Sequence, residues 1–359
     1  MNNPLLINLA VLFAKPTGIA TYAQNVINSF ASLNPVLLSA EDFPGFEGYQ
    51  IADDMTPAQG SNGHLRRLFW TQFKLPQIYQ QLNADLIYSP IPEAPLYSKS
   101  RSVVMCHDLI PLRFPRLTSP LTNYFRYVVP QVLRQAEHII CNSQATATDI
   151  VDYYGIKAEK VTPILLGYDR SNFYPREAAS NSEAPYFLYL GRCDPYKNLS
   201  GLIQAFAALP NPDYHLAIAG STDPRFTPQL QQQAEELGIA HRIKWLHYLS
   251  YEELPVVISN AVALVFPTLW EGFGLPVLEA MACGTPVITS NLASLPEITG
   301  DAAVLIDPYQ TEEITFAMLA VGEDSKLRSQ LQQLSLQQAQ KFSWSKTGAQ
   351  TKEVLQQFL

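Results

Sequence analysis

Residues 267–287 read PTLWEGFGLPVLEAMACGTPV and place Glu271 and Glu279 on either side of two glycines and a proline. In one continuous helix, side chains eight residues apart would point roughly 80° away from each other, and the glycines and the proline would weaken it. We therefore predict an apolar strand over AVALVFPT, a glycine loop that carries Glu271, and a helix with Pro276 at its first position and Gly284 at its end. Such a strand, loop and helix start are the repeating unit of a parallel α/β sheet.

Short β-branched runs alternate with amphipathic stretches along the entire chain, which is typical of parallel sheets flanked by helices. A chain of 359 residues is long for one core, and a prior of about 150 residues per domain favours two domains. The pattern restarts after a Pro-, Ser- and Asn-rich span near 168–184. We predict an N-terminal domain over 1–168, extended by a C-terminal helix over 344–359, and a C-terminal domain over 169–343.

Charge and cysteine content narrow the classes of function. The chain carries 24 basic and 32 acidic residues, a formal net charge of −8, so we expect no general affinity for nucleic acid. The four cysteines have no CxxC spacing and lie in or beside apolar runs, which predicts buried free thiols in a reducing compartment. The first apolar run, PLLINLAVLFA, follows no basic region, and we interpret it as the first strand of a cytoplasmic protein.

The stretch FLYLGRCDPYKNLSGLIQAF predicts a strand, a turn and the start of a helix, with Arg192 and Lys197 on the turn. In parallel sheets, ligands bind beyond the carboxyl ends of the strands, where helix N-termini offer unpaired N–H groups. Two cations at this place match a diphosphate in charge and in donor count. Two solvated surface charges are the alternative, and the glycine loop around Glu271 favours the phosphate interpretation.

Four motifs together resemble one known family. GRCDPYKN, followed by EGFGLPVLE, is similar to the donor half of the retaining glycosyltransferases of family four, and TGIATY and HDLIPLRFP in the first half resemble the same family. The resemblance covers nearly the entire chain. It implies the α/β fold called GT-B, with two facing Rossmann-like domains, a central cleft, and a C-terminal helix that crosses back to the N-terminal domain.

The resemblance also implies an activity. A hexose, glucose or mannose, would move from a UDP- or GDP-linked nucleotide sugar to a saccharide or lipid-linked saccharide acceptor in polysaccharide or glycolipid biosynthesis, with its anomeric configuration retained. The leaving phosphate oxygen would help to deprotonate the acceptor hydroxyl, and a covalent intermediate is the mechanism left open beside it. No cofactor and no metal are implied, because arginine and lysine can supply the positive charge that the leaving diphosphate needs.

Carried over residue by residue, the resemblance assigns Arg192 and Lys197 to the diphosphate, Glu279 to the ribose hydroxyls and Glu271 to the transferred sugar. The catalytic residues so implied are His107, Glu271, Arg192 and Lys197. The other residues implied to bind the donor are Gly18, Asp108, Gly191, Asn198, Tyr248, Leu249, Phe273, Gly274, Leu275 and Glu279. Two positions depart from the family, since Thr17 and His247 stand where a glycine is common.

Two other functions are compatible with the sequence. A nucleotide-sugar 2-epimerase would bind a similar donor on the same architecture, but such enzymes lack this arrangement of EGFGLPVLE with GRxxxxKN. The second alternative is a non-catalytic nucleotide-sugar-binding partner in a polysaccharide assembly complex. The joint presence of five residues argues against it: His107, Arg192, Lys197, Glu271 and Glu279.

The segment LRRLFWTQFKLP, residues 65–76, mixes Arg66, Arg67 and Lys74 with three aromatic residues. It is either a membrane-surface helix that reaches a lipid-linked acceptor, or an amphipathic helix packed on the N-terminal sheet with its basic face in water. We favour packing, because surface charges usually indicate only a solvated face. A peripheral contact with the inner face of a membrane is the expectation left open.

Overall fold

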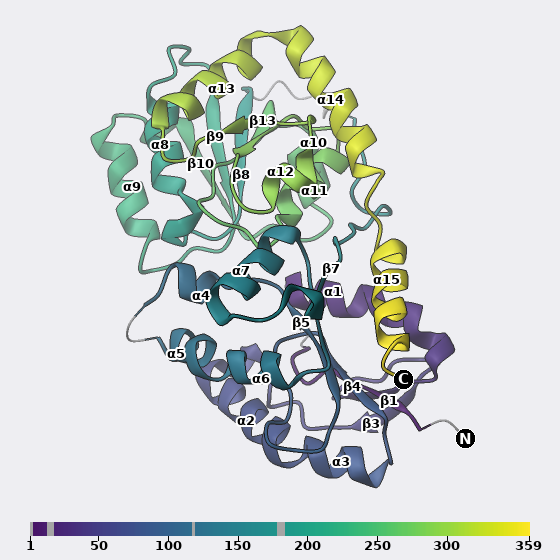
Figure 1. The fold of residues 1–359 in the computed structure, drawn as a ribbon. Helices are drawn as coiled ribbons and strands as arrows, with labels where there is room; N and C mark the ends of the chain where they lie inside the picture. Colours follow the sequence, from purple (N-terminus) through teal and green to yellow (C-terminus); the bar gives the residue numbers. More distant parts are fainter. Residues whose placement is uncertain (1–2, 13–17, 117–118, 178–183) are drawn as a thin grey trace. The chain divides into compact units, whose positions relative to one another are not determined.

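The chain forms two compact units (Figure 1). The computed structural model describes all residues except 1–2, 13–17, 117–118 and 178–183. One unit consists of Met1–Gly167 and Trp344–Leu359, and the other of Tyr168–Ser343. Each unit has its own parallel sheet flanked by helices, which confirms the Rossmann-like fold predicted for both halves.

The N-terminal unit is built on a seven-stranded parallel sheet of order β3-β2-β1-β4-β5-β6-β7. The strand order reverses between β1 and β4, so the loops that follow the central strands open at a topological switch point. The strands are β1 Leu5–Asn8, β2 Val36–Ser39, β3 Glu47–Gln50, β4 Leu86–Ser89, β5 Ser102–Cys106, β6 His138–Cys141 and β7 Val161–Pro163.

Helices cover this sheet, and the last helix of the chain is among them. The helix α15 packs against α1 and the 3-10 segment η1, which confirms the predicted return of the C-terminal helix to the N-terminal domain. The helical segments are α1 Gly18–Ile27, η1 Asn28–Leu33, η2 Pro57–Gln59, α2 Gly60–Phe73, α3 Leu75–Gln81, α4 Ile110–Arg113, α5 Pro120–Tyr127, α6 Val129–Gln135, α7 Gln144–Tyr154, η3 Ala158–Lys160 and α15 Trp344–Gln356.

The C-terminal unit is built on a six-stranded parallel sheet of order β10-β9-β8-β11-β12-β13, which reverses between β8 and β11. Its strands are β8 Tyr186–Leu190, β9 His215–Ala219, β10 Ile243–His247, β11 Ala263–Phe266, β12 Val287–Ser290 and β13 Val304–Ile306. Its α-helices are α8 Leu199–Ala207, α9 Thr227–Glu236, α10 Leu254–Ser259, α11 Leu275–Ala282, α12 Leu295–Thr299, α13 Thr311–Glu323 and α14 Ser325–Ala339.

The stretch around Glu271 folds as a strand, a loop and a helix, as predicted, but the helix begins one residue earlier than expected. The helix α11 begins at Leu275, so Pro276 is its second residue and not its first. A proline fits there equally well, because the second N–H of a helix has no intrahelical acceptor either. Glu279 lies in the second turn of α11. The four cysteines are free and buried, as predicted.

One basic residue of helix α2 is buried, contrary to the predicted solvated basic face. Arg67 is buried and binds Glu93 through two contacts, Nε to Oε2 at 2.8 Å and Nη2 to Oε1 at 2.9 Å. The prediction that this face lies in water is therefore wrong at Arg67, because the loop after β4 supplies a carboxylate that compensates its desolvation. The solvent-facing side chains of α2 include large apolar ones: Leu65, Phe69 and Phe73 are 50%, 63% and 63% exposed. Among the described residues, none of the helices is long and apolar enough to cross a bilayer.

Candidate functional site

The switch point of the C-terminal sheet brings the two predicted donor loops together. The strands β8 and β11 are neighbours, so the loop from Gly191 and the loop after Phe266 leave the same edge of the sheet. Two hydrogen bonds then fix one loop to the other: the Leu269 N–H and the Thr268 hydroxyl both donate to the Tyr196 carbonyl oxygen, at 2.7 and 3.1 Å. Sequence reasoning had identified the two loops but not this connection between them.

Lys197 and Glu271 meet at this edge. The Lys197 Nζ donates to Glu271 Oε1, and the two side chains are only 13% and 11% exposed. The same ammonium lies 5.2 Å from the centre of the Phe266 ring, at the end of β11. An ammonium has three N–H donors, so Lys197 can hold Glu271 and still donate to a phosphate oxygen.

Two glycines allow the ends of β8 and β9 to approach closely. A Cβ atom on Gly220 would lie 1.9 Å from the Gly191 carbonyl oxygen, so no other residue fits at Gly220 without a backbone shift. The Gly220 N–H donates to the His247 carbonyl oxygen at 2.7 Å, and His247 has a φ of 55°. This left-handed conformation accounts for the glycine common in the family at that position. Gly220 was missed, although its place directly after a strand was a usable signal.

The loop between Glu271 and α11 presents unpaired amides. The Ser294 hydroxyl lies 3.0 Å from the Glu271 carbonyl oxygen and 2.6 Å from that of Phe273, so both carbonyls turn towards the buried Ser294. Gly274 has a φ of 109°, and a Cβ there would lie 2.7 Å from the Leu295 side chain. The N–H groups of residues 273–275 have no acceptor among the described residues. Together with the N-terminus of α11, they form a site suited to an anion.

The charges at this edge nearly cancel before any ligand binds. Arg192 is 70% exposed, and its Nε lies 2.9 Å from Oδ2 of the buried Asp194. With Lys197 on Glu271, each cation therefore has its own carboxylate. The net attraction for a diphosphate must come from the amides and from the N–H donors that the two cations keep. Asp194 was not among the predicted site residues.

Glu279 lies one turn further along α11, near enough to Tyr251 and Cys283 that, besides their burial, its charge raises the pKa of both. Burial raises the pKa of this partly buried carboxyl from 4.5 to about 7. Its side chain has no hydrogen bond or ion pair to another described residue. A carboxylate without protein donors is matched to a ligand that brings its own hydroxyl groups.

The remaining predicted donor residues of this unit differ in exposure. The Asn198 side chain donates to the Pro308 carbonyl oxygen at 2.7 Å, and Asn198 adopts a φ of 57° directly before α8. Its amide thus anchors the turn that carries Lys197. Tyr248 is 67% exposed and Leu249 is partly buried, and both directly follow β10.

In the N-terminal unit, His107 directly follows β5. Its Nε2 lies 2.9 Å from the Pro90 carbonyl oxygen, which can only accept, so Nε2 carries the proton. Burial lowers the pKa of His107 from 6.5 to about 4, and the imidazole is therefore neutral at pH 7. The Asp108 carboxylate accepts from the Ile110 N–H at 3.0 Å. Gly18 is the exposed first residue of α1, whereas Thr17 lies outside the described residues.

Two family models match adjacent parts of the sequence. The model described as Glycosyltransferase Family 4 matches residues 16–172, and the model described as Glycosyl transferases group 1 matches residues 171–338. The chain belongs to glycosyltransferase family 4. The two models together span both units of the chain, which is therefore of a class of enzymes that transfer sugars.

Curated relatives agree with this family 4 assignment, and solved structures share the fold of the chain. O-antigen chain mannosyltransferase B of Escherichia coli is 28% identical over 93% of the chain and 94% of its own length, and O-antigen chain mannosyltransferase RfbU of Salmonella typhimurium is 26% identical over 85% and 87%. Sucrose-phosphate synthase of Thermosynechococcus elongatus and Anabaena Alr3699/HepE, the latter in complex with UDP and glucose, each have a TM-score of 0.78 at 20% identity. Both cover 99% of the chain, and are themselves covered over 99% and 100% of their lengths.

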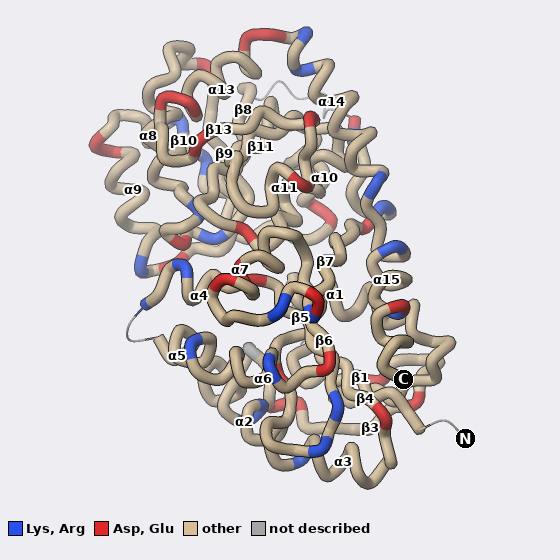
Figure 2. Tube along the Cα trace, in the orientation of Figure 1, with Lys and Arg blue, Asp and Glu red and all other residues tan. Residues whose placement is uncertain are grey.

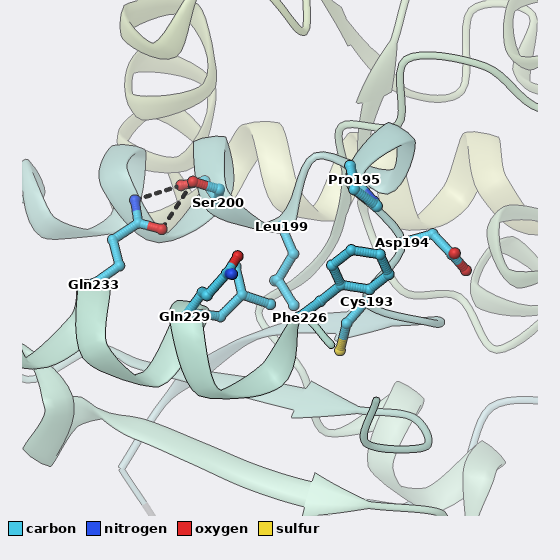
Figure 3. Close-up of a pocket in the computed structure, with 9 residues that line it drawn as sticks. Cys193, Asp194, Pro195, Leu199, Ser200, Phe226, Gln229 and Gln233 are labelled. Atoms are coloured by element: carbon cyan, nitrogen blue, oxygen red, sulfur yellow. Dashed lines mark hydrogen bonds between the residues drawn. The ribbon is translucent and has the colours of Figure 1, made fainter. Parts of the chain in front are cut away.

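The C-terminal unit also has a cavity of about 210 Å³ between α8 and α9 (Figure 3). Its lining is mainly apolar and includes Cys193, Leu199 and Phe226, and Ser200 and Gln233 are hydrogen-bonded to each other at one side. Asp194 is its only charged lining residue. A diphosphate binds cations and free N–H groups, which lie at the neighbouring strand ends and not among the residues that line this cavity.

Proposed function

We propose that the chain is a metal-independent, retaining hexosyltransferase that transfers glucose or mannose from a UDP- or GDP-linked sugar. One observation carries the proposal: the Lys197–Glu271 contact lies on the same strand edge as the unpaired amides of residues 273–275. A nucleotide sugar has a diphosphate next to hydroxyl groups, and this edge combines donors for the first with an acceptor for the second. The mannosyltransferase relatives favour mannose as the transferred sugar.

The proposed roles follow from the contacts in the C-terminal unit. Lys197 and Arg192 bind the diphosphate, and Lys197 also holds Glu271 in place to accept hydrogen bonds from the transferred sugar. The amides of residues 273–275 receive phosphate oxygens as negative charge builds up on the leaving group. Glu279 accepts hydrogen bonds from the ribose, which supplies the partners that this carboxylate lacks in the protein.

His107 acts from the N-terminal unit in this proposal. Because Nε2–H of His107 donates to the Pro90 carbonyl oxygen, Nδ1 of the neutral imidazole is free to accept a hydrogen bond from a sugar hydroxyl. A neutral His107 adds no positive charge beside the electron-deficient carbon that forms as the glycosidic bond breaks. Asp108 and Gly18 shape the loops at the start of α4 and α1.

The acceptor is proposed to be a saccharide or a lipid-linked saccharide in polysaccharide synthesis, on the cytoplasmic side of a membrane. The experiment is release of nucleoside diphosphate from GDP-mannose and from UDP-glucose, with and without such acceptors, and NMR of the product anomer. Acceptor-dependent release with a retained anomer supports the proposal. Sugar epimerisation without transfer identifies an epimerase instead, and binding of nucleotide sugar without turnover identifies a non-catalytic partner.

A peripheral contact with an anionic membrane is proposed for the exposed face of α2. Phe69 and Phe73 are stacked with ring centres 6.1 Å apart, and Leu65 continues the same stripe one turn earlier. Residues 57–136 contain nine basic and three acidic residues in a chain of net charge −8, and Figure 2 shows basic positions on α2, α5 and α6. Four of the nine are paired with carboxylates, namely Arg66, Arg67, Arg101 and Arg113, and Arg67 is buried. Apolar side chains flanked by basic ones match the headgroup region of anionic lipids.

Vesicle sedimentation tests this membrane contact. The wild-type chain should bind vesicles that contain an anionic lipid and bind neutral vesicles weakly, and Phe69→Ser with Phe73→Ser should release it. Phe316→Ser is the matched control, because Phe316 is 68% exposed on α13 of the other unit. Equal binding by the wild type and the double variant would exclude α2 as the contact.

A further inference from the structure

Tyr22 on α1 is fully buried and lies directly against His107. The centres of the two rings are 5.2 Å apart, and their planes make an angle of 80°, which is the T-shaped geometry that aromatic pairs favour. Tyr22 belongs to the helix that begins at Gly18, whereas His107 follows β5. The contact therefore joins two segments that are far apart in sequence.

The Tyr22 ring is itself held from two further elements. Its hydroxyl is hydrogen-bonded to the hydroxyl of the buried Tyr88 on β4. On another side, the Trp344 ring at the start of α15 lies 6.4 Å away, centre to centre, at 63°. A buried tyrosine that is packed by an indole and bound at its hydroxyl has little rotational freedom.

His107, by contrast, has one hydrogen bond through its ring. Only Nε2 is bonded, to the Pro90 carbonyl oxygen, and Nδ1 has no partner among the described residues. One hydrogen bond still permits the imidazole to tilt about it. The ring of Tyr22 occupies the space into which such a tilt would move the imidazole.

We infer that Tyr22 is a positioning residue for His107. Its ring keeps the imidazole hydrogen-bonded to the Pro90 carbonyl oxygen, so that Nδ1 remains available to the donor sugar. The inference rests on the proposed function for the role of His107, but the packing that carries it does not. Tyr88 and Trp344 take part by fixing Tyr22 in turn. The Tyr22 hydroxyl is hydrogen-bonded to that of Tyr88, so this tyrosine acts through His107 and not on the substrate.

The Tyr22 ring also affects the pKa of His107, which can be measured without turnover. Burial is what lowers the pKa of His107, and the Pro90 carbonyl acts in the opposite direction. If the Tyr22 ring shields the imidazole, its removal admits water and stabilises the charged form. The pKa of His107 should then rise from about 4 towards 6.5.

Titration of the histidine ring resonances by NMR measures this directly, with the His107 signal assigned by its loss in His107→Asn. Tyr22→Leu removes the ring, whereas Tyr22→Phe keeps it and deletes only the hydroxyl. Tyr124→Leu is the matched control, because Tyr124 makes an equivalent contact with His64, at 5.2 Å and 84° in the same unit. It removes a tyrosine of similar burial without touching His107.

In Tyr22→Leu, we expect a raised His107 pKa and a kcat roughly tenfold or more below wild type, as small displacements of a reacting group cost that much. Affinity for the free nucleoside diphosphate should stay within about twofold of wild type, because its contacts lie in the other unit. Tyr22→Phe should keep the low pKa and most of the kcat. Tyr124→Leu should leave the His107 pKa unchanged.

A folded Tyr22→Leu variant with the wild-type His107 pKa would overturn the inference, as would an equal pKa change in Tyr124→Leu. If Tyr22→Leu does not fold, Trp344→Leu replaces it, since loss of the indole frees the Tyr22 ring and should raise the same pKa. An unchanged pKa there overturns the inference equally. If only the proposed function fails, the wild type will show no sugar transfer, whereas the His107 pKa will still rise in Tyr22→Leu.

Discussion

Replacement of Glu279 by Gln should stabilise the protein at alkaline pH and weaken its affinity for the donor. The folded-state pKa of Glu279 is about 7, above the ordinary value of 4.5, because burial disfavours the carboxylate. Between pH 4.5 and 7 the folded chain holds a proton that the unfolded chain has lost, so the free energy of unfolding falls as the pH rises through this window.

The size of the effect follows from the same two values. The difference between about 7 and 4.5, multiplied by about 1.36 kcal/mol for each pH unit, gives a penalty of about 3 kcal/mol. The penalty is absent below pH 4.5 and complete above pH 7. A glutamine of nearly the same shape carries no charge at any pH and escapes it. Relative to the wild type, Glu279→Gln should therefore gain roughly 2–3 kcal/mol between pH 5 and pH 8.

Urea unfolding of both proteins at pH 5, 6, 7 and 8 measures this difference, because all other titrating groups cancel between them. Glu323→Gln is the control, since Glu323 is exposed on α13 and should show no such trend. The reasoning is refuted if the wild type and Glu279→Gln keep a constant difference across the range. It is also refuted if the variant loses stability relative to the wild type as the pH rises.

The same substitution should weaken binding of free nucleoside diphosphate and of donor by about 1–2 kcal/mol, because an amide is a weaker acceptor for ribose hydroxyls than a carboxylate. Binding of the ribose favours the ionised form, so wild-type affinity should increase from pH 6 to pH 8. Isothermal calorimetry at both pH values tests this. A stabilised variant with undiminished affinity would leave Glu279 as a buried acid and remove it from the donor site.

Three further outcomes are expected. Lys197→Ala and Arg192→Ala should each weaken binding of the free nucleoside diphosphate roughly tenfold or more, since a charge-assisted hydrogen bond contributes about 1.5–3 kcal/mol; unchanged affinity by calorimetry in both would refute the diphosphate assignment. Glu271→Gln should bind the diphosphate almost normally yet turn over slowly at saturating donor, because the sugar is no longer held for attack; lost affinity with normal turnover would reverse its role. Activity should persist in EDTA, because Arg192 and Lys197 supply the positive charge for the leaving group; complete loss that Mn²⁺ or Mg²⁺ restores would contradict metal independence.

Much of the fold could be predicted from local pattern. The strand, loop and helix around Glu271 follow from apolar runs, glycines and a proline within a single stretch of chain, and the restart of the pattern indicates a second sheet. Boundaries were less accurate, and α11 begins one residue earlier than predicted. The edge strands β3 and β7 have little local signal, because one has the polar sequence EGYQ and the other only three residues.

The sequence by itself determined which segments bear the chemistry, since turn residues and strand ends are set by neighbours in the chain. The tertiary structure decided which side chains meet. Lys197 contacts Glu271 because the sheet order places β8 beside β11, and Arg67 is buried because a loop 26 residues away supplies Glu93. No local pattern encodes such pairs: whether a buried polar group is tolerated depends on the partner that packing brings to it. Tyr22 beside His107 is of the same kind, since its place follows from three elements that converge only in the folded chain.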